Sequence, residues 1–283
     1  MSTSGLNVQA GDRGCWCPEL KGKTAIITGA GGARGLGKDI ALELARQGVN
    51  VVLTDISPPG AAPAQGDGWQ GVASVAALVE AAGAAALPLV SDITDPQSVD
   101  AVVAGTIERF GGIDFLVNNA GAAVAGDRVP VTDMPLAEWN RVLGVNLNGS
   151  FLMSRAVGKA MIERGQGGAI VNISSIASRQ AAPRNAAYAV SKAALNTLSR
   201  VMAMELGPHR IRVNTIMPGL TLTSRLGNLP ESEGWDAFVK NYVPLGFAGA
   251  ANEIAYMCTY LCSDMGKWIS GQDIAVDGGS SWR

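Results

Sequence analysis

Short runs of apolar and β-branched residues alternate along the chain with segments whose apolar positions recur at the helical period. Leu36, Ile40 and Leu44, for example, share one face of a helix that follows the first run. The predicted strands cover residues 24–28, 49–54, 86–90, 115–118, 169–173, 211–216 and 273–276. Their nearly continuous apolar character is typical of strands buried on both faces. The alternation predicts an α/β fold: a single-domain, doubly wound parallel sheet of Rossmann type with helices on both faces.

Two segments interrupt this alternation. Residues 1–19 are polar, contain glycine and lack periodicity, so they predict a flexible N-terminal extension before a domain of residues 20–283. After Asp55, a segment rich in proline and glycine separates the second strand from the next helical pattern. We interpret this segment, about residues 57–71, as a loop insertion.

Composition narrows the range of functions. The chain has 283 residues, of which 47% are hydrophobic, enough for one large core; charged residues make up 16% and the net charge is −2. This low and nearly neutral charge gives no sign of the basic surface that binds nucleic acid or anionic lipid. The sequence has no run of about 18 apolar residues and no basic N-terminus followed by an apolar segment. We expect a cytoplasmic protein with a small-molecule partner and with neither a nucleic-acid nor a membrane partner.

Cysteine and histidine content argues against a metal centre and against a hydrolase. Cys15 and Cys17 form a lone C-x-C without a second ligand pair, whereas Cys258 and Cys262 fall in an apolar run as small core residues. The single histidine, His209, precedes a predicted strand in a polar context, which leaves a Ser-His-Asp hydrolase unsupported. No cluster has metal-ligand spacing, so no metal is expected.

A glycine-rich turn, residues 28–37, joins the first predicted strand to the first helix. Its glycines allow backbone N–H groups to approach a pyrophosphate at the helix N-terminus. Glycine also serves ordinary tight turns, but this turn follows a strand, opens a helix and precedes an acidic residue at the end of the next strand. The candidate cofactor contacts in the turn are Gly29, Arg34, Gly35, Leu36 and Gly37.

Two residues near this turn favour different dinucleotides. Asp55 lies 20 positions after Gly35, the distance at which a carboxylate meets the adenosine ribose hydroxyls. Its charge repels the additional phosphate of NADP, whereas Arg34 could pair bidentately with that phosphate. A helix-capping role is the alternative for Asp55. The direct charge penalty favours NAD as the cofactor, with NADP as the second choice.

Six further motifs follow in an order that resembles the short-chain dehydrogenase/reductase family, in its common single-domain branch. The resemblance covers residues 20–279. The motifs are Asp92-Ile93, the NNAG turn ending at Gly121, Asn146 in GVNLNGSF, Ser174-Ser175, the YxxxK pair Tyr188 and Lys192, and the PGxxxT segment from Pro218 to Thr223. One departure concerns the glycine turn, where five residues separate the first two glycines instead of the family's usual three.

The resemblance assigns roles to these positions. It implies that the dinucleotide contacts Ile56, Asp92, Ile93, Asn119, Ala120, Gly121, Tyr188, Lys192, Pro218, Gly219, Thr221 and Thr223. It also implies a catalytic tetrad of Asn146, Ser175, Tyr188 and Lys192, with a kinked helix at Asn146 and a bound water that links Lys192 to solvent.

The chemistry of hydride transfer explains why these residue types suit such a site. Hydride transfer from an alcohol requires removal of the hydroxyl proton, and the reverse reaction requires its return, so one acid/base serves both directions. Tyr188 is the candidate. A free phenol titrates near pH 10, and a cation on the same helix face, here Lys192, favours its ionised form. A packed tyrosine beside a solvated lysine, a plain strand-end Ser175 and an ordinary helix Asn146 are the alternatives.

The substrate pocket should be lined by residues 122–131, 176–185 and a substrate loop of about residues 220–247. The leucines and aromatic residues of that loop favour a largely apolar secondary alcohol or ketone, although they could instead pack a mobile lid. Arg179 and Arg184 could meet a carboxylate, but arginines on such loops are usually solvated. The expected enzyme is thus an NAD-dependent alcohol dehydrogenase or ketone reductase.

Two other functions stay open at this point. The tetrad does not separate this activity from that of a dihydrodiol or sugar-type dehydrogenase. A non-catalytic nucleotide-sensing protein could also retain the site. The resemblance further implies a homo-oligomer, a tetramer, in which the long helices expected at residues 135–164 and 187–206 pack in pairs.

Overall fold

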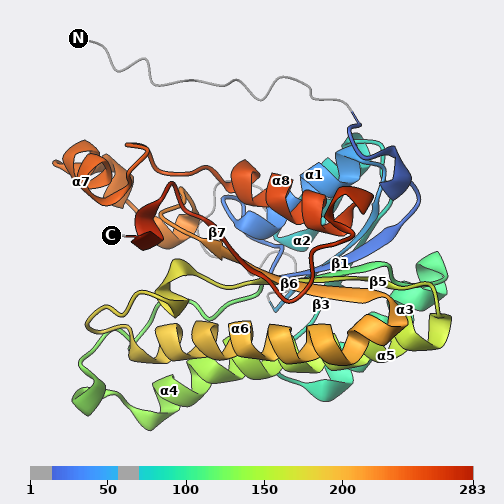
Figure 1. Cartoon of the computed structure of the whole chain (residues 1–283), viewed down its shortest axis with the longest axis horizontal. Coiled ribbons are helices and arrows are strands. Elements are labelled where there is room, and N and C mark those ends of the chain that lie inside the picture. The colour runs from blue at the N-terminus through green and yellow to red at the C-terminus, as the bar shows by residue number, and fades with distance from the viewer. Residues whose placement is uncertain (1–14, 57–69, 283) are drawn as a thin grey trace.

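The computed structural model describes residues 15–56 and 70–282. A single parallel sheet of seven strands forms its centre, in the order β3-β2-β1-β4-β5-β6-β7 (Figure 1). The strands are β1 Thr24–Thr28, β2 Asn50–Asp55, β3 Ala86–Val90, β4 Phe115–Asn118, β5 Gly168–Ile173, β6 Ile211–Pro218 and β7 Asp273–Val276. All seven predicted strands are present, with their bounds shifted by two residues at most. The predicted doubly wound α/β fold is confirmed.

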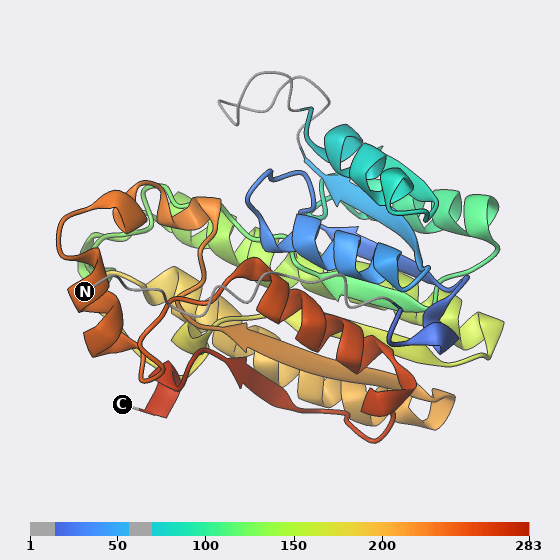
Figure 2. The ribbon, with the colours of Figure 1, turned by 90° about the horizontal axis from the view of Figure 1, so that it is seen from above.

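Helices cover both faces of the sheet (Figures 1 and 2). The helices are α1 Leu36–Arg46, α2 Val72–Ala81, α3 Pro96–Phe110, α4 Leu136–Leu143, α5 Ser150–Arg164, α6 Ala186–Leu206, α7 Trp235–Tyr242 and α8 Ala251–Cys262. One buried apolar cluster joins the sheet to α1, α2 and α8, and a second joins it to α3, α5 and α6. Because the strands from β1 to β6 contribute side chains to both clusters, their sequences are nearly continuous apolar runs.

The N-terminal part of the fold begins earlier than the sequence suggested. Cys17 is fully buried in the first cluster, and the Trp16 indole donates a hydrogen bond to Glu43 Oε1 on α1 at 2.9 Å. The backbone N–H of Trp16 also donates to Gln47 Oε1 at 2.8 Å. Residues 15–19, expected in the flexible extension, therefore pack on the domain. Residues 1–14 and most of the predicted insertion, 57–69, lie outside the described residues.

The helix expected over residues 135–164 is interrupted. α4 ends at Leu143, and a π-helical segment, Gly144–Gly149, connects it to α5. Such segments widen one helical turn and often mark functional sites. This segment contains Asn146, so the irregularity falls at the position where the family resemblance implied a kink.

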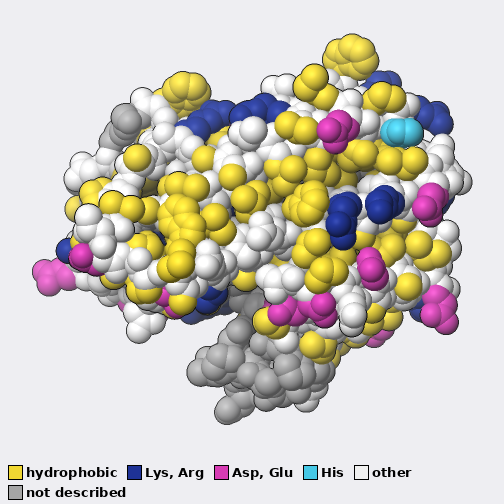
Figure 3. All heavy atoms as spheres, turned by 90° about the horizontal axis from the view of Figure 1, so that it is seen from below, with side chains coloured by type: hydrophobic (Ala, Val, Ile, Leu, Met, Phe, Trp, Pro, Cys, Tyr) yellow, Lys and Arg dark blue, Asp and Glu magenta, His cyan; other side chains and the backbone are white. Residues whose placement is uncertain are grey.

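The outer face of α5 and α6 carries exposed apolar side chains. Phe151 on α5 and Val190, Val201 and Met204 on α6 all reach solvent, Met204 with 81% of its surface. Hydrophobic side chains are spread over this side of the molecule (Figure 3). Exposed apolar side chains that gather on one face are typical of a protein–protein contact.

Candidate active site

A cleft of about 1290 Å³ opens at the carboxyl ends of the strands. In the strand order, β1 and β4 are the neighbours from which the chain winds in opposite directions. Open α/β sheets bind ligands at such a switch point, because the loops that leave the two strands diverge and leave a crevice. The cleft is lined by the turns after β1, β2, β3 and β4 at one end and by those after β5 and β6 at the other.

The glycine turn and the start of α1 form a cradle for phosphate groups. Gly35 is the N-cap of α1 and offers no side-chain cap, so the first N–H groups of the helix remain available to an anion. Gly29 has φ +65°, and a Cβ there would lie 2.6 Å from the Ala120 Cα. Both Gly29 and Gly35 line the cleft. These residues fit the pyrophosphate of a dinucleotide.

The turn after β4 holds this cradle in place. Asn119 Nδ2 donates to the carbonyl oxygens of Thr28 and Gly29, both at 2.9 Å, and the Thr28 hydroxyl accepts from the Asn119 N–H at 3.1 Å. Gly37 packs directly beneath, where a Cβ would lie 2.7 Å from Asn119 Nδ2. The NNAG turn and the glycine turn therefore form one rigid wall.

The structure separates the two residues that favour different dinucleotides. Asp55 lines the cleft at the end of β2, where its Oδ2 accepts a hydrogen bond of 2.8 Å from the Gly31 N–H and its Oδ1 accepts from the Ile56 N–H. Gly31 is one of the residues in the lengthened part of the glycine turn. Arg34 is exposed and does not line the cleft. The carboxylate, and not the guanidinium, thus lines the cleft at the end of β2.

Three of the predicted tetrad residues share one wall at the other end of the cleft. Ser175 follows β5, while Tyr188 and Lys192 lie one turn apart on α6. The neighbouring Ser174 is buried and donates its hydroxyl to the Lys192 carbonyl at 3.1 Å. Ser175 Oγ, in contrast, meets only the Ala177 N–H at 3.2 Å among the described residues. Ser175 is therefore the serine with a hydroxyl proton free for a ligand.

The ammonium group of Lys192 lies in an electrostatically unfavourable environment. Its side chain is buried and its Nζ donates to the Ile173 carbonyl at 2.8 Å, with no carboxylate paired to it among the described residues. Burial and, to a smaller extent, the like charge of Arg225 together lower the pKa of Lys192 from 10.5 to about 7. The Nζ lies 5.8 Å from the centroid of the Tyr188 ring. The ammonium, when protonated, therefore lies close to the Tyr188 ring.

Asn146 connects the site to the helices behind it. It is fully buried in the π-helical segment, where its Oδ1 accepts from the Ala122 N–H at 2.8 Å and its Nδ2 donates to Ser191 Oγ at 2.9 Å. Ser191 in turn donates to the Tyr188 carbonyl at 2.8 Å. Asn146 thus fixes the turn after β4 to the helix that presents Tyr188.

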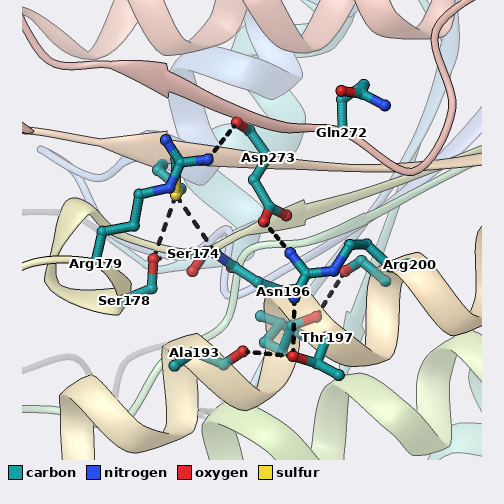
Figure 4. A network of polar contacts seen from close by, with 12 residues as sticks. Ser174, Ser178, Arg179, Ala193, Asn196, Thr197, Arg200, Gln272 and Asp273 are labelled. Carbon is teal, nitrogen blue, oxygen red and sulfur yellow. Dashed lines mark hydrogen bonds and ion pairs between the residues drawn. The ribbon is translucent and has the colours of Figure 1, made fainter.

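A polar network around Ser178, Arg179 and Asn196, which the sequence did not indicate, lies next to the turn that follows β5 (Figure 4). Asn196 on α6 donates to Ser178 Oγ at 3.0 Å, and Ser178 Oγ donates to the Ser175 carbonyl at 2.7 Å. Beside it, Arg179 Nη2 donates to the Asp273 carbonyl on β7 at 3.1 Å. The network ties the Ser175 turn to α6 and to the sheet edge, so it sets where the Ser175 hydroxyl lies.

Most predicted cofactor contacts line the cleft together. Those that do are Gly29, Gly35, Leu36, Asp55, Ile56, Asp92, Ile93, Asn119, Ala120, Gly121, Tyr188, Lys192, Pro218, Gly219, Thr221 and Thr223. Arg34, Gly37 and Asn146 do not line it. Arg34 is exposed, whereas Gly37 and Asn146 lie buried behind the wall.

The substrate end combines apolar residues with arginines. Leu226 and Tyr242 line it, but Leu229, Trp235 and Phe238 do not. Four arginines line it, of which only Arg179 was singled out from the sequence; they are Arg128, Arg141, Arg179 and Arg225. Arg184 stays outside the lining. No single-sequence signal marks Arg128, Arg141 and Arg225, because they lie in separate segments that the fold brings together.

Within residues 15–56 and 70–282, no group of three or more His, Cys, Asp or Glu side chains could hold a metal ion. In the same part of the chain, no helix is long and apolar enough to cross a membrane.

Comparison with known proteins places the chain in a family. A family model described as enoyl-(acyl carrier protein) reductase matches residues 29–281. The D-threitol dehydrogenase of Mycolicibacterium smegmatis is 37% identical over 264 residues, which cover 92% of this chain and 93% of that protein. A short-chain type dehydrogenase/reductase from Mycobacterium marinum has a crystal structure similar to this one, with a TM-score of 0.81 and 33% identity over 92% of this chain and 96% of that chain.

A third similar structure is a 7α-hydroxysteroid dehydrogenase in complex with NADH and 7-oxo glycochenodeoxycholic acid. It has a TM-score of 0.81 and 36% identity, covering 92% of this chain and 95% of that one. The chain belongs to the short-chain dehydrogenase/reductase family, a class of nucleotide-binding oxidoreductases with the Rossmann-type fold.

Proposed function

We propose that this protein is an NAD(H)-dependent oxidoreductase that interconverts a secondary alcohol and a ketone, with Tyr188 as the acid/base. The observation that carries the proposal is the shared wall of Ser175, Tyr188 and Lys192, at the opposite end of one cleft from the phosphate cradle. A dinucleotide held by that cradle spans the cleft toward Tyr188. The relatives are dehydrogenases of polyols and hydroxysteroids, which supports the same reaction class.

Each side chain of the wall has a distinct task. A bound nicotinamide supplies the acceptor or donor of the hydride. Tyr188 accepts the hydroxyl proton of the alcohol in oxidation and returns it to the ketone oxygen in reduction. Ser175 donates a hydrogen bond to the same substrate oxygen and holds it beside the phenol. Lys192 places its Nζ 5.8 Å from the Tyr188 ring centroid, as the charged partner of the ring while it holds its proton.

The site favours NAD over NADP. Asp55 places a carboxylate at the ribose end of the cleft, where the 2′-phosphate of NADP would meet a like charge. The rival cation, Arg34, does not line the cleft. A 7α-hydroxysteroid dehydrogenase of similar structure was solved with NADH, which agrees with this choice.

A panel of secondary alcohols with NAD⁺, read by NADH absorbance, tests the proposal. We expect turnover of some members, and we expect Tyr188→Phe to lower kcat at least about 100-fold while NADH binds with nearly the same affinity. Equal activity in the variant would contradict the mechanism. Tight NADH binding without turnover of any alcohol would favour the alternative, a non-catalytic nucleotide-sensing protein.

The apolar outer face of α5 and α6 supports assembly into a homo-oligomer, as the family resemblance implied. Two copies that pack Phe151, Val201 and Met204 against each other would remove these side chains from water. Light scattering after size-exclusion chromatography tests this: Met204→Glu together with Val201→Glu should shift the mass toward the monomer.

A further inference from the structure

Charge is divided unequally between the two ends of the cleft. Its acidic lining residues, Asp55 and Asp92, follow β2 and β3 at the nucleotide end. The described residues that line the end around Tyr188 include four arginines and Lys192 but no carboxylate. A positively charged pocket raises the local concentration of anionic ligands and binds them preferentially.

Three of these cations surround the Tyr188 ring. The Cζ atoms of Arg128 and Arg225 lie 5.1 Å and 5.3 Å from the ring centroid, and Lys192 Nζ lies 5.8 Å from it. Arg128 comes from the segment after β4, and Arg225 from the short turn Ser224–Leu226 after β6. Each cation is attracted to the ring face, and besides burial the like charge of Arg225 contributes to the lowered pKa of Lys192.

Arg225 differs from Arg128 and Arg141 in the carboxylates that contact it. Asp127 contacts both Arg128 and Arg141, and Glu138 contacts Arg141, so two carboxylates offset these two arginines. Arg225 forms no ion pair within the described residues. Its Nη2 donates to the neutral Ala122 carbonyl at 3.0 Å, and the residue lines the cleft. The guanidinium beside the acid/base is therefore held in position without a counter-ion.

We propose that the substrate is a hydroxy acid, or the corresponding keto acid, whose carboxylate binds Arg225 with Arg128 beside it. A guanidinium presents paired N–H donors that match a carboxylate, which makes this contact both strong and directional. Because Arg225 contacts the Tyr188 ring, the carboxylate lies a few bonds from the carbon that gives up hydride. The carboxylate itself is unchanged: the carbinol carbon loses hydride to the nicotinamide and its oxygen loses a proton to Tyr188.

This inference rests on the proposed function and replaces the largely apolar substrate expected from the sequence. An anionic oxygen could also come from a phosphate of the dinucleotide, because Ser224, next to Arg225, donates its N–H to the Arg34 carbonyl in the glycine turn at 2.8 Å. The favoured source is the substrate, since the Arg225 Cζ lies 5.3 Å from the centroid of the Tyr188 ring. The experiment distinguishes the two.

The first arm measures kcat/KM for short secondary hydroxy acids and for their matched amides. Wild type should prefer the acids at least about ten-fold. Arg225→Gln, which keeps a donor for Ala122, should lower kcat/KM for the acids about 10- to 100-fold more than for the amides, the scale of a charged hydrogen bond. Arg184→Gln, at an exposed arginine that does not line the cleft, is the control and should retain the wild-type preference.

The second arm measures binding of benzoate and benzamide to the NADH-loaded protein, so it does not depend on turnover. Benzoate should bind more tightly than benzamide to wild type, and Arg225→Gln should remove the difference. Equal binding of the two, or a wild-type preference for amides, would overturn the proposal. The proposal would also be overturned if Arg225→Gln lost NADH affinity and its kcat/KM fell equally for acids and amides. That result would assign Arg225 to a phosphate of the cofactor. Absence of turnover for every alcohol refutes only the proposed function.

Discussion

Burial of the Lys192 ammonium predicts a specific pH dependence of stability. The side chain is enclosed by protein, and burial, assisted by Arg225, lowers its pKa from 10.5 to about 7. Lys192→Met keeps the length of the chain and removes the titrating group. The unfolded lysine holds its proton up to pH 10.5, whereas the folded one releases it near pH 7. The substitution should therefore change how the free energy of unfolding depends on pH.

The sign follows from proton binding. Below about pH 7 both states are protonated, and the cost of the buried charge is fully present. Between about pH 7 and pH 10.5 the unfolded state binds more protons, so the Lys192 contribution rises by up to about 1.4 kcal/mol per pH unit. From about pH 6 to about pH 9, wild type should gain about 2.5 kcal/mol relative to Lys192→Met.

Urea unfolding of the cofactor-free protein, followed by tryptophan fluorescence at one protein concentration, measures this difference. Lys159→Met, at an exposed lysine of α5, is the matched control and should follow the wild-type profile. If wild type and Lys192→Met gave parallel profiles over this range, the ammonium would not be desolvated in the folded state. The lowered pKa of Lys192, and with it the enclosed and unpaired position of the ammonium, would then be wrong.

Three further substitutions test other parts of the site. Asp55→Ala should narrow the ratio of kcat/KM between NAD⁺ and NADP⁺, and an unchanged ratio would show that Asp55 is not the selector. Gly37→Ala should lower the free energy of unfolding, measured in urea, by about 1–3 kcal/mol, because the new Cβ would meet Asn119 and Gly29. Gly32→Ala is the control and should leave this free energy unchanged, since the nearest atom to its Cβ would lie at 3.7 Å. Asn196→Ala should lower kcat roughly ten-fold with unchanged NADH affinity, since the Ser175 turn loses its support.

The parts of the fold that the sequence predicted are those set by local pattern. The strands are recognisable because both faces of the sheet are covered, so most strand positions are apolar. The cofactor end is recognisable because glycine and aspartate are required at fixed distances along one βαβ unit. Ser175, Tyr188 and Lys192 were predicted from family spacing, and the structure brings them to one wall, although their roles remain proposals.

The features that the sequence did not predict depend on contacts between distant segments. Arg128 and Arg225 lie in different loops, and each resembles an ordinary solvated arginine until the fold places both on the Tyr188 ring. Asn196 reads as a neutral helix residue, although it supports the Ser175 turn through Ser178. The burial of Cys17 likewise depends on Glu43 and Gln47 of the first helical region, which hold the preceding segment.

The order of the strands explains why one cleft carries opposite charges at its two ends. β2 and β3 lie on one side of the switch point and end in Asp55 and Asp92, whereas β5 and β6 lie on the other and lead to Ser175 and Arg225. A dinucleotide that crosses β1 and β4 must place its ribose hydroxyls near the carboxylates and its nicotinamide near the cations. An anionic substrate then meets the one end of the cleft that attracts it, with its reacting carbon beside Tyr188.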